Sequence, residues 1–357
     1  MAAINMAEYG LLGKFEALAN EHSPQYRVAR ILSQEKGLYR LISENGEQLG
    51  EVCGKLRYSA DSTSDFPAVG DFVLIGKGCM QDNAVIHEIL PRKSVFVRKA
   101  AGTTSEKQVV AANIDTVFIC MSLNNDFNLR RLERYLSVAW DSGATPVIVL
   151  TKSDLCNDLS ERFGEVESIA FGTDIIITSG IREDGYVKLL PYIKQGKTVA
   201  LIGSSGVGKS TLINRLIGED RLETNGLRND DKGRHTTTRR ELFLLKSGGM
   251  VIDTPGMREL GLWEAEEGLD KTFADVEELA SRCRFGNCTH TNEPGCAVLQ
   301  AIYSGELSEA RWQSYRKLLN ENRYTGNNAE YMAEKRKKFK NIAKINKLSH
   351  ESKDYLK

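Results

Sequence analysis

A glycine-rich stretch at residues 203–211 has the residue types and the spacing of a phosphate-binding loop. It fits the pattern G-x-x-x-x-G-K-[ST]. Its residues are Gly203, Ser204, Ser205, Gly206, Val207, Gly208, Lys209, Ser210 and Thr211. The glycines would let backbone N–H groups surround a phosphate at the start of a helix. Lys209 would reach the β- and γ-phosphates and Ser210 would bind Mg²⁺, so we expect all of these residues to contact a nucleoside triphosphate.

A second phosphate-sensing motif follows the apolar segment 250–253. There the chain reads Asp253-Thr254-Pro255-Gly256, which fits the pattern D-x-x-G. We expect Asp253 to hold Mg²⁺ through water and the Gly256 N–H to contact the γ-phosphate. Met257 then stands where many GTPases have a glutamine that orients the attacking water, and a thioether cannot polarise water. Hydrolysis by the chain alone is therefore expected to be slow.

A polar stretch at residues 233–238 lies between these two motifs and suits a mobile switch loop. It reads Gly233-Arg234-His235-Thr236-Thr237-Thr238. One threonine would complete the Mg²⁺ shell; we name Thr237, with Thr236 and Thr238 as alternatives. His235 is the candidate for orienting water and joins Lys209 and Asp253 as catalytic residues. The alternative is a solvent-exposed loop histidine.

A short motif after the apolar segment 146–150 has the composition of a guanine-reading box. Its residues are Thr151, Lys152, Ser153 and Asp154, where the usual pattern is N-K-x-D. The Asp154 carboxylate would accept from guanine N1–H and N2–H₂ and would repel the N1 lone pair of adenine. Thr151 replaces an asparagine whose amide normally braces the phosphate loop, so we expect looser binding rather than altered specificity. Ser179, in the small-residue stretch 178–180, resembles a further base-contacting box.

Four potential metal ligands crowd into residues 283–296. They are Cys283, Cys288, His290 and Cys296. Three thiolates and an imidazole form a closed tetrahedral set for one structural Zn²⁺, with no open position for a catalytic water. The flanking segments are short and polar, so the metal is expected to contribute much of the stability of this part. The odd total of seven cysteines does not suggest a disulfide framework.

Apolar segments before these motifs predict the strands that must hold them. We expect strands at 114–120, 146–150, 174–178, 199–203 and 250–253, and helices at 129–140 and 211–216. Continuous apolar strands that alternate with helices indicate a parallel sheet covered on both faces, the α/β fold of a P-loop GTPase. The base-reading boxes precede the phosphate loop, whereas they follow it in ordinary small GTPases. The fold is therefore predicted to be circularly permuted, which leaves the sheet unchanged.

Regions of different character flank this α/β region. Short strands predict a small all-β barrel of the OB-fold type, and they are expected at 26–33, 38–43, 48–58, 71–76, 84–90 and 94–98. Beyond residue 270 the chain becomes helical and polar. We expect four regions: a loosely tied extension (1–24), an OB-fold RNA-binding domain (25–100), a GTPase domain (101–269) and a mainly helical zinc-binding domain with a basic tail (270–357).

Composition bounds the class of protein. The 357 residues carry 48 Lys and Arg against 48 Asp and Glu, and the apolar content of 41% excludes a disordered chain. No apolar run approaches the ~20 residues that span a bilayer, so we expect a cytoplasmic protein with no membrane partner. The zero net charge hides a basic end, because residues 311–357 carry thirteen Lys and Arg against five Asp and Glu. Candidate RNA contacts lie in this tail, at 334–347, and at Arg92, Lys93, Arg98 and Lys99.

From about residue 26 to 320 the sequence resembles the RsgA or YjeQ family of permuted GTPases. The resemblance includes Val69-Gly70-Asp71, the run 90–94, the run 111–115 and the switch stretch 233–238. It implies an OB-fold, a permuted GTPase domain and a zinc domain in that order, and its zinc ligands match residue by residue. It also favours His235 for orienting water. The implied function is late maturation of the small ribosomal subunit, through binding the subunit and its rRNA, with hydrolysis of GTP to GDP stimulated by the subunit. We expect a monomer.

Two other classes of protein are weighed against this reading. The first is a P-loop ATPase or kinase, which Lys152 and Asp154 disfavour and which competition between GTP and ATP would test. The second is a non-enzymatic RNA-binding protein with a vestigial nucleotide site. Intact Lys209, Ser210 and Asp253 disfavour it.

Overall fold

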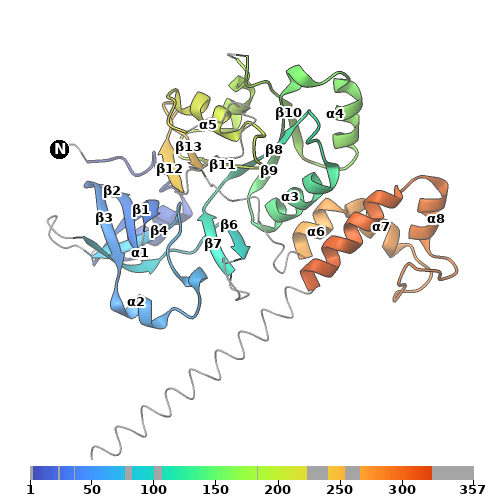
Figure 1. The fold of residues 1–357 in the computed structure, drawn as a ribbon. Helices are drawn as coiled ribbons and strands as arrows, with labels where there is room; N and C mark the ends of the chain where they lie inside the picture. Colours follow the sequence, from blue (N-terminus) through green and yellow to red (C-terminus); the bar gives the residue numbers. More distant parts are fainter. Residues whose placement is uncertain are drawn as a thin grey trace, which may run out of the picture.

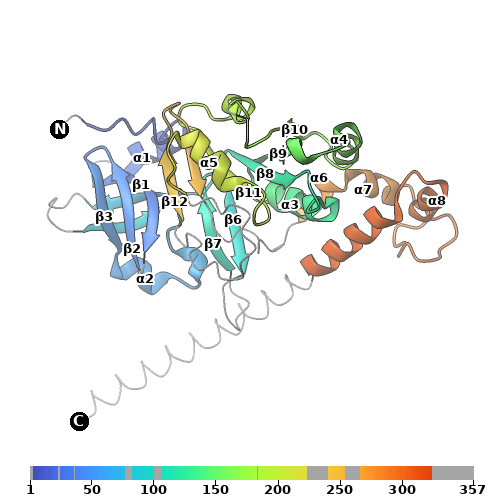
Figure 2. The ribbon, with the colours of Figure 1, turned by 45° about the horizontal axis from the view of Figure 1, so that its top comes forward.

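The computed structural model describes residues 3–22, 25–35, 37–76, 83–99, 107–182, 184–222, 240–253 and 266–323. A barrel, a central α/β sheet and a group of helices lie in a row, with the barrel and the helices at opposite ends (Figure 1). The same order is seen in the view turned by 45° (Figure 2). Within the described ranges, no helix is both long and apolar enough to cross a membrane.

Five strands form the N-terminal barrel. They are β1 (Tyr26–Glu35), β2 (Leu38–Ser43), β3 (Gly46–Val52), β4 (Phe72–Gly76) and β5 (Ala84–Ile89). They follow the order β1-β2-β3-β5-β4, and β4 pairs back onto β1, which closes the barrel. Alternate side chains such as Ala29, Ile31 and Leu41 fill its interior. The predicted OB-fold barrel is confirmed.

Two of the predicted barrel strands differ from the structure. The segment 48–58 is strand only to Val52 and continues as helix α2 (Gly54–Ser59), because Cys53 Sγ caps the helix by accepting from the Leu56 N–H. The segment 94–98 becomes β6 (Val95–Lys99) outside the barrel sheet. It pairs instead with β7 (Lys107–Ala112), a strand that the sequence did not indicate.

The N-terminal segment packs onto the barrel. Met6 is buried in the central core, and the Ile4 N–H donates to the Glu44 carbonyl. Phe15, on helix α1 (Lys14–His22), lies against Phe72 with ring centroids 4.5 Å apart. The prediction of a loosely tied extension is therefore wrong for residues 3–22, because a few apolar anchors outweigh their polar composition.

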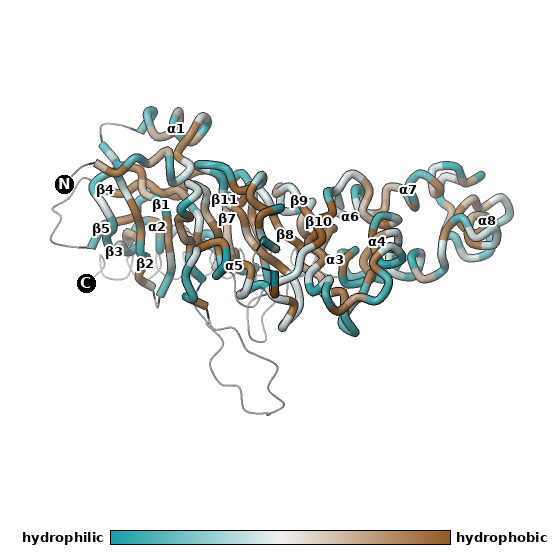
Figure 3. The backbone as a smooth tube through the Cα atoms, turned by 90° about the horizontal axis from the view of Figure 1, so that it is seen from above, coloured by the Kyte–Doolittle hydropathy of each residue, from teal (hydrophilic) through white to brown (hydrophobic). Residues whose placement is uncertain are grey.

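The central sheet is parallel over five strands. These are β8 (Thr116–Ser122), β9 (Thr145–Thr151), β10 (Asp174–Ile177), β11 (Thr198–Ile202) and β13 (Met250–Asp253), in the order β10-β9-β8-β11-β13. Along β8, Val117 and Ile119 pack in one core with helix α3 (Leu129–Asp141). Phe118 lies in the opposite core with helix α5 (Lys209–Ile217), and helix α4 (Leu159–Glu167) follows β9. Figure 3 shows the hydrophobic residues concentrated along these strands, so the predicted sheet covered on both faces is confirmed.

Strand β12 (Glu241–Leu244) joins the barrel to the central sheet. It pairs antiparallel with β13, and its Glu241 pairs with Ser33 of β1, so barrel and central strands form one 11-stranded sheet. Strand β12 was not predicted, because four residues are too few to show a hydrophobic period.

Arg30 of β1 seals this junction from inside. Its side chain is buried, and it donates to the Tyr9 carbonyl at 2.5 Å, to Thr198 Oγ1 at 2.8 Å and to the Gly70 carbonyl at 3.2 Å. Burial lowers the pKa of Arg30 to about 10, which leaves the guanidinium charged at neutral pH. One side chain thus links the N-terminal segment, the barrel and the central sheet.

The C-terminal helices attach to helix α3. They are α6 (Glu266–Thr272), α7 (Ala274–Ser281), α8 (Ala297–Ser304) and a helix at 309–323. Helix α6 runs across the expected boundary at 269 and lies so close to α3 that a Cβ on Gly268 would be 2.1 Å from the Ser137 carbonyl oxygen. Figure 1 shows these helices beside α3, on the side of the sheet away from the barrel.

A buried ionic cluster fixes the 309–323 helix to α3. Arg311 donates to Glu133 Oε1 at 2.9 Å and makes two bonds of 2.6 Å to the Asp275 carboxylate. Ser314 Oγ donates to Glu133 Oε2 at 2.5 Å. Burial raises the pKa of Glu133, while these donors act to lower it. The C-terminal region is therefore held to the central sheet by side-chain contacts, this ionic cluster and a shared apolar core, rather than by strand pairing.

Candidate nucleotide site and metal cluster

The turn between β11 and α5 has the backbone geometry that phosphate binding needs. Gly203, Gly206 and Gly208 have φ angles of +144°, +69° and +104°. A Cβ on Gly203 would lie 2.4 Å from the Cys120 carbonyl oxygen, so glycine alone fits there. The N–H groups at the start of α5 favour an anion, and Ser210 and Thr211 lie in its first turn.

The Lys209 side chain folds back across this loop. Its Nζ donates to the Gly203 carbonyl at 2.9 Å and to the Ser204 carbonyl at 2.6 Å. The ammonium group is thereby held over the loop, where a bound polyphosphate would meet it.

Thr151 braces the phosphate loop from the end of β9. Its hydroxyl donates to the Val207 carbonyl at 2.6 Å and lies 3.4 Å from the Met121 carbonyl oxygen. Both Thr151 and Val207 are buried, which strengthens this hydrogen bond. The loop therefore keeps a brace at this position, contrary to the expected loss of one, while the looser binding expected from the threonine stays a prediction.

The predicted base-reading residues come together at the same edge of the sheet. Lys152 has φ +56° and starts a 3₁₀ turn, Ser153–Leu155, so the chain bends sharply after β9. Ser179 Oγ donates to Asp154 Oδ1, which joins the two boxes. A Cβ on Gly180 would lie 3.3 Å from Thr211 Cγ2, so the second box touches the start of α5.

The predicted Mg²⁺ ligands are partly described. Ala200 of β11 pairs with Ile252 of β13, so Asp253 ends its strand beside the strand that leads into the phosphate loop. The Ser210 hydroxyl and the Asp253 carboxylate are oxygen donors of the kind Mg²⁺ prefers, so these two residues fit the ion. His235, Thr237 and Gly256 lie outside the described residues.

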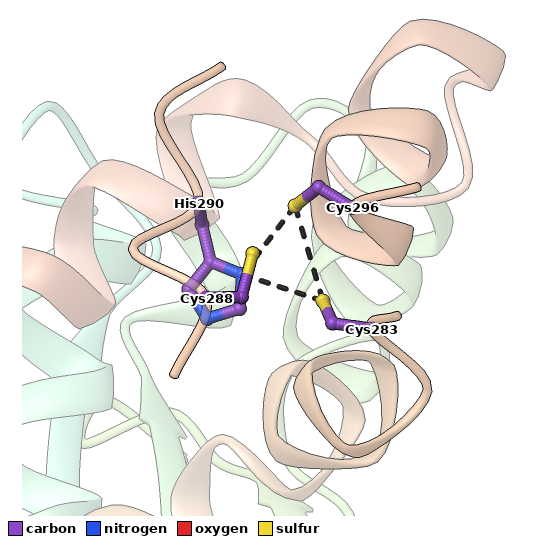
Figure 4. Close-up of side chains that lie close together, drawn as sticks. All are labelled: Cys283, Cys288, His290 and Cys296. Carbon is purple, nitrogen blue, oxygen red and sulfur yellow. Dashed lines mark hydrogen bonds between the residues drawn. The ribbon is translucent and has the colours of Figure 1, made fainter. Parts of the chain in front are cut away.

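The three cysteines and the histidine of the C-terminal region converge, as Figure 4 shows. The ligand atoms of Cys283, Cys288, His290 and Cys296 all lie within 4.8 Å of one another. His290 Nδ1 is 3.5 Å from Cys283 Sγ and 3.4 Å from Cys296 Sγ. His290 has φ +55°, a conformation that turns the loop back toward α8. This cluster could hold a metal ion, and its three sulfur donors and one nitrogen donor fit a tetrahedral structural site.

The thiol environments also fit a cation. Desolvation raises the pKa of Cys283, but N–H groups of Val298 and Ala297 in the first turn of α8 lower it below its usual value. Desolvation and the neighbouring thiols raise the pKa of Cys288 to about 11. Crowded thiolates repel one another, so all three ionise together only beside a positive ion.

Aromatic packing connects the cysteine cluster to the 309–323 helix. The His290 and Trp312 rings meet edge to face with centroids 5.4 Å apart, and Trp312 stacks on Tyr315 at 5.7 Å. The Tyr315 hydroxyl donates to Glu277 of α7. The cluster therefore supports the packing of the helices around it.

Two of the candidate RNA contacts form ion pairs within the protein. Arg92 donates to Asp71 Oδ1 at 2.8 Å and to Oδ2 at 2.7 Å, and it also bonds the Ser64 carbonyl. Lys93 Nζ lies 2.8 Å from Asp115 Oδ1. Arg92 is largely buried in this network, so the expectation of RNA contact is wrong for it, whereas Lys93 stays exposed beside Asp115 and its RNA contact stays a prediction. The basic tail at 334–347 lies outside the described residues.

Sequence reasoning missed the polar residues that support the phosphate loop. Ser204 Oγ donates to Asp126 Oδ2 at 2.6 Å, and Arg131 donates to Asp126 Oδ1 at 2.8 Å. The one local signal is Asn128, which caps α3 and shows that a structured loop precedes the helix.

The barrel, the permuted order of the motifs and the phosphate loop define a circularly permuted P-loop GTPase with two flanking domains. The model of the RsgA GTPase family matches residues 89–263. A small ribosomal subunit biogenesis GTPase, RsgA 2 of Lactiplantibacillus plantarum, is 49% identical over 330 residues, 92% of each chain. RsgA 1 of Oceanobacillus iheyensis is 46% identical over 88% of this chain and 91% of its own. The chain therefore belongs to the RsgA GTPase family.

Two solved structures agree with this assignment. YjeQ from Thermotoga maritima matches with a TM-score of 0.61 and 27% identity, over 83% of this chain and 98% of its own. YloQ, described as a circularly permuted GTPase, matches with a TM-score of 0.58 and 26% identity, over 85% of this chain and 96% of its own. The permuted order predicted from the motifs is thereby confirmed.

Proposed function

We propose that this protein hydrolyses GTP to GDP and phosphate while it assists late maturation of the small ribosomal subunit, and that the subunit stimulates hydrolysis. The observation that carries the proposal is the meeting of Asp154 and Ser179 with the phosphate loop at one edge of the sheet. Relatives that cover most of the chain bear the name of small ribosomal subunit biogenesis GTPases. The working compartment would be the cytoplasm, where such subunits are available.

The residues would divide the work as follows. Lys209 and the loop N–H groups would bind the phosphates, Asp154 would read the guanine edge, and Ser179 would support Asp154. Ser210, Asp253 and Thr237 would hold Mg²⁺, which neutralises charge on the β- and γ-phosphates. His235 would orient the attacking water once the subunit orders its loop, since Met257 cannot.

The test of the proposed activity is GTP turnover with and without purified small ribosomal subunits. We expect strong stimulation by subunits, lost in His235→Ala while GTP affinity is retained. His22→Ala, on helix α1 far from the nucleotide edge, is the matched control and should behave as the wild type. Absence of stimulation in the wild type would contradict the ribosomal role, and full stimulation in His235→Ala would contradict the role of this histidine.

Base specificity has its own test at Asp154. Asp154→Asn replaces two acceptor oxygens by an acceptor and a donor, which suits the C2 carbonyl of xanthine. We expect the variant to lose GTP affinity and to gain affinity for xanthosine triphosphate, with ATP unbound by either form. An unchanged preference for GTP would remove Asp154 from the base site.

The metal and RNA contacts complete the proposal. One Zn²⁺ would occupy the Cys283, Cys288, His290 and Cys296 cluster, and metal analysis of the purified protein should find one zinc per chain.

The basic tail would contact rRNA phosphates, so ending the chain at residue 323 should weaken subunit binding and flatten its salt dependence. Retention of affinity and salt dependence would contradict the tail's role. The chain would act as a monomer, which its sedimentation without subunits would test.

A further inference from the structure

A carboxylate beside the phosphate loop has no part in the roles given above. Asp126 lies in the loop after β8, and its Oδ2 accepts from Ser204 Oγ at 2.6 Å. Arg131, in the first turn of α3, donates to Asp126 Oδ1 at 2.8 Å and also to the Asp126 carbonyl. The Asp126 carboxylate thus connects the phosphate loop to helix α3.

The backbone around Asp126 is well fixed. Asn124 Oδ1 accepts from the Asp126 N–H at 3.1 Å and from Ser122 Oγ at 2.8 Å. Asn128 Oδ1 accepts from the Arg131 N–H at 2.9 Å, which caps α3. The carboxylate therefore has a defined position on a short loop between two rigid elements.

The charge of Asp126 calls for a specific explanation. Desolvation raises its pKa, but the hydrogen bond from Ser204 and the positive charges of Arg131 and Lys152 lower it below the usual value, so it is ionised at neutral pH. A negative charge beside a loop that binds polyphosphate opposes binding by simple electrostatics. The ion pair with Arg131 offsets the negative charge of Asp126. The carboxylate therefore contributes to the phosphate loop through its hydrogen bond to Ser204 rather than through its charge.

The position of Ser204 matters because its carbonyl accepts from Lys209 Nζ at 2.6 Å. Asp126 therefore fixes the Ser204 side chain, and the Ser204 carbonyl fixes the ammonium group of Lys209, which would bind phosphate. Small displacements of a positioned charge lower the rate of a reaction more than they lower the affinity for the substrate.

We propose that Asp126 is a positioning residue for GTP hydrolysis, which acts through Ser204 on Lys209 and is itself positioned by Arg131. This inference rests on the proposed GTPase function. It assigns to Asp126 a contribution to turnover rather than to nucleotide affinity.

The first experiment measures kcat and KM for GTP in the presence of small ribosomal subunits. We expect Asp126→Ala to lower kcat about tenfold or more with KM changed less than about threefold. Asp126→Asn keeps an acceptor for Ser204 and should recover part of the loss. Asp158→Ala is the matched control, because Asp158 caps helix α4 as an exposed residue and should leave kcat unchanged.

Ser204→Ala supplies the coupling test. If Asp126 acts through Ser204, the double variant Asp126→Ala/Ser204→Ala is no slower than the slower single variant. Losses that multiply in the double variant, or an equal loss in kcat and affinity, would overturn the proposal.

Hydrogen exchange of the amides at 203–209, measured without subunits or turnover, keeps the inference separate from the proposed function. Faster exchange in Asp126→Ala and Ser204→Ala than in Asp158→Ala supports the positioning role, even if the wild type proves inactive on GTP. Unchanged exchange at the loop would overturn it, even if GTPase activity is confirmed.

Discussion

The barrel and the C-terminal helices flank the same central sheet but are joined to it by different contacts. The barrel shares backbone hydrogen bonds through β1 and β12, and Arg30 binds carbonyl and hydroxyl oxygens across the junction. The C-terminal helices meet α3 through side chains: a shared apolar core and the Glu133–Arg311–Asp275 cluster, in which Arg130 also pairs with Glu133.

This difference predicts how each junction responds to change. Strand pairing and a buried Arg30 make the barrel part of one cooperative unit with the central sheet. A junction made by side chains, beside a cysteine cluster that could hold a metal ion, should allow the C-terminal helices to unfold separately. The predictions below test this contrast.

Loss of the metal is expected to have the largest effect. Structural zinc contributes of order 10 kcal/mol to small metal-dependent domains. Chelation, or Cys296→Ser, should therefore unfold residues 274–323 while the barrel and central sheet keep slow amide exchange. Cys156→Ser, an isolated cysteine outside the cluster, is the control. If the barrel, the central sheet and the C-terminal helices all lose slow amide exchange together, the C-terminal helices do not unfold separately.

Removal of Arg311 is expected to be the next most severe change. Arg311→Ala leaves the Glu133 and Asp275 carboxylates without their shared partner, which destabilises by about 4 kcal/mol. Denaturant unfolding should show an earlier separate transition of the C-terminal helices. The exposed Lys317→Ala on the same helix should change stability by less than about 0.5 kcal/mol. If Arg311→Ala unfolds in one transition at the same denaturant concentration as the wild type, the ionic cluster does not hold the C-terminal helices to α3.

Arg30 tests the other junction. Arg30→Ala leaves several buried oxygen atoms without a hydrogen-bond donor and creates a cavity. We expect it to lower the free energy of unfolding by about 3 kcal/mol. Here barrel and central sheet should lose stability together, in one transition. Arg27→Ala, whose ion pair with Glu44 is partly exposed, should lower stability by much less, about 1 kcal/mol or below. Separate melting of the barrel in Arg30→Ala would show that the two parts are not one unit.

Acid should lower the free energy of unfolding by a smaller amount, through Asp115, which directly precedes β8. Desolvation raises the pKa of Asp115, but Lys93 and the other donors lower it below its usual value. Its contacts therefore stabilise fully above the unfolded carboxyl pKa of about 4 and are lost as the pH falls through the lower folded value. Asp115→Asn should lower the free energy of unfolding by about 1 kcal/mol at pH 7. Its stability should also fall less than that of the wild type as the pH drops below 4, and denaturant unfolding measures both effects. An identical acid dependence in the variant would exclude Asp115 as its source.

Much of the site followed from local sequence. The phosphate loop, the Asp154 motif and the cysteine spacing each depend on residues within a few positions, and local geometry then fixes where they lie. Their neighbouring strands were equally clear, because the run 117–121 and similar runs are continuously apolar. The OB-fold barrel followed from short strands and turns, although the second half of one expected strand is helix α2 and another expected strand pairs with β7 outside the barrel.

What failed at the sequence level depended on distant partners. Thr151 was expected to weaken the loop, yet its hydroxyl reaches Val207, which is far along the chain. Arg92 was expected to face solvent, but in the fold it is paired with the buried carboxylate of Asp71. Asp126, Arg30 and Arg311 gave no local pattern at all.

The sequence by itself determined the chemistry of this protein, namely a permuted GTPase with a cluster of potential metal ligands, because short motifs carry both the reactive groups and their backbone geometry. The tertiary structure alone decided which charges serve the fold and how the flanking regions are joined. Hydrogen bonds and ion pairs between residues far apart in the chain exist only once folding has set their distances, so no local pattern encodes them.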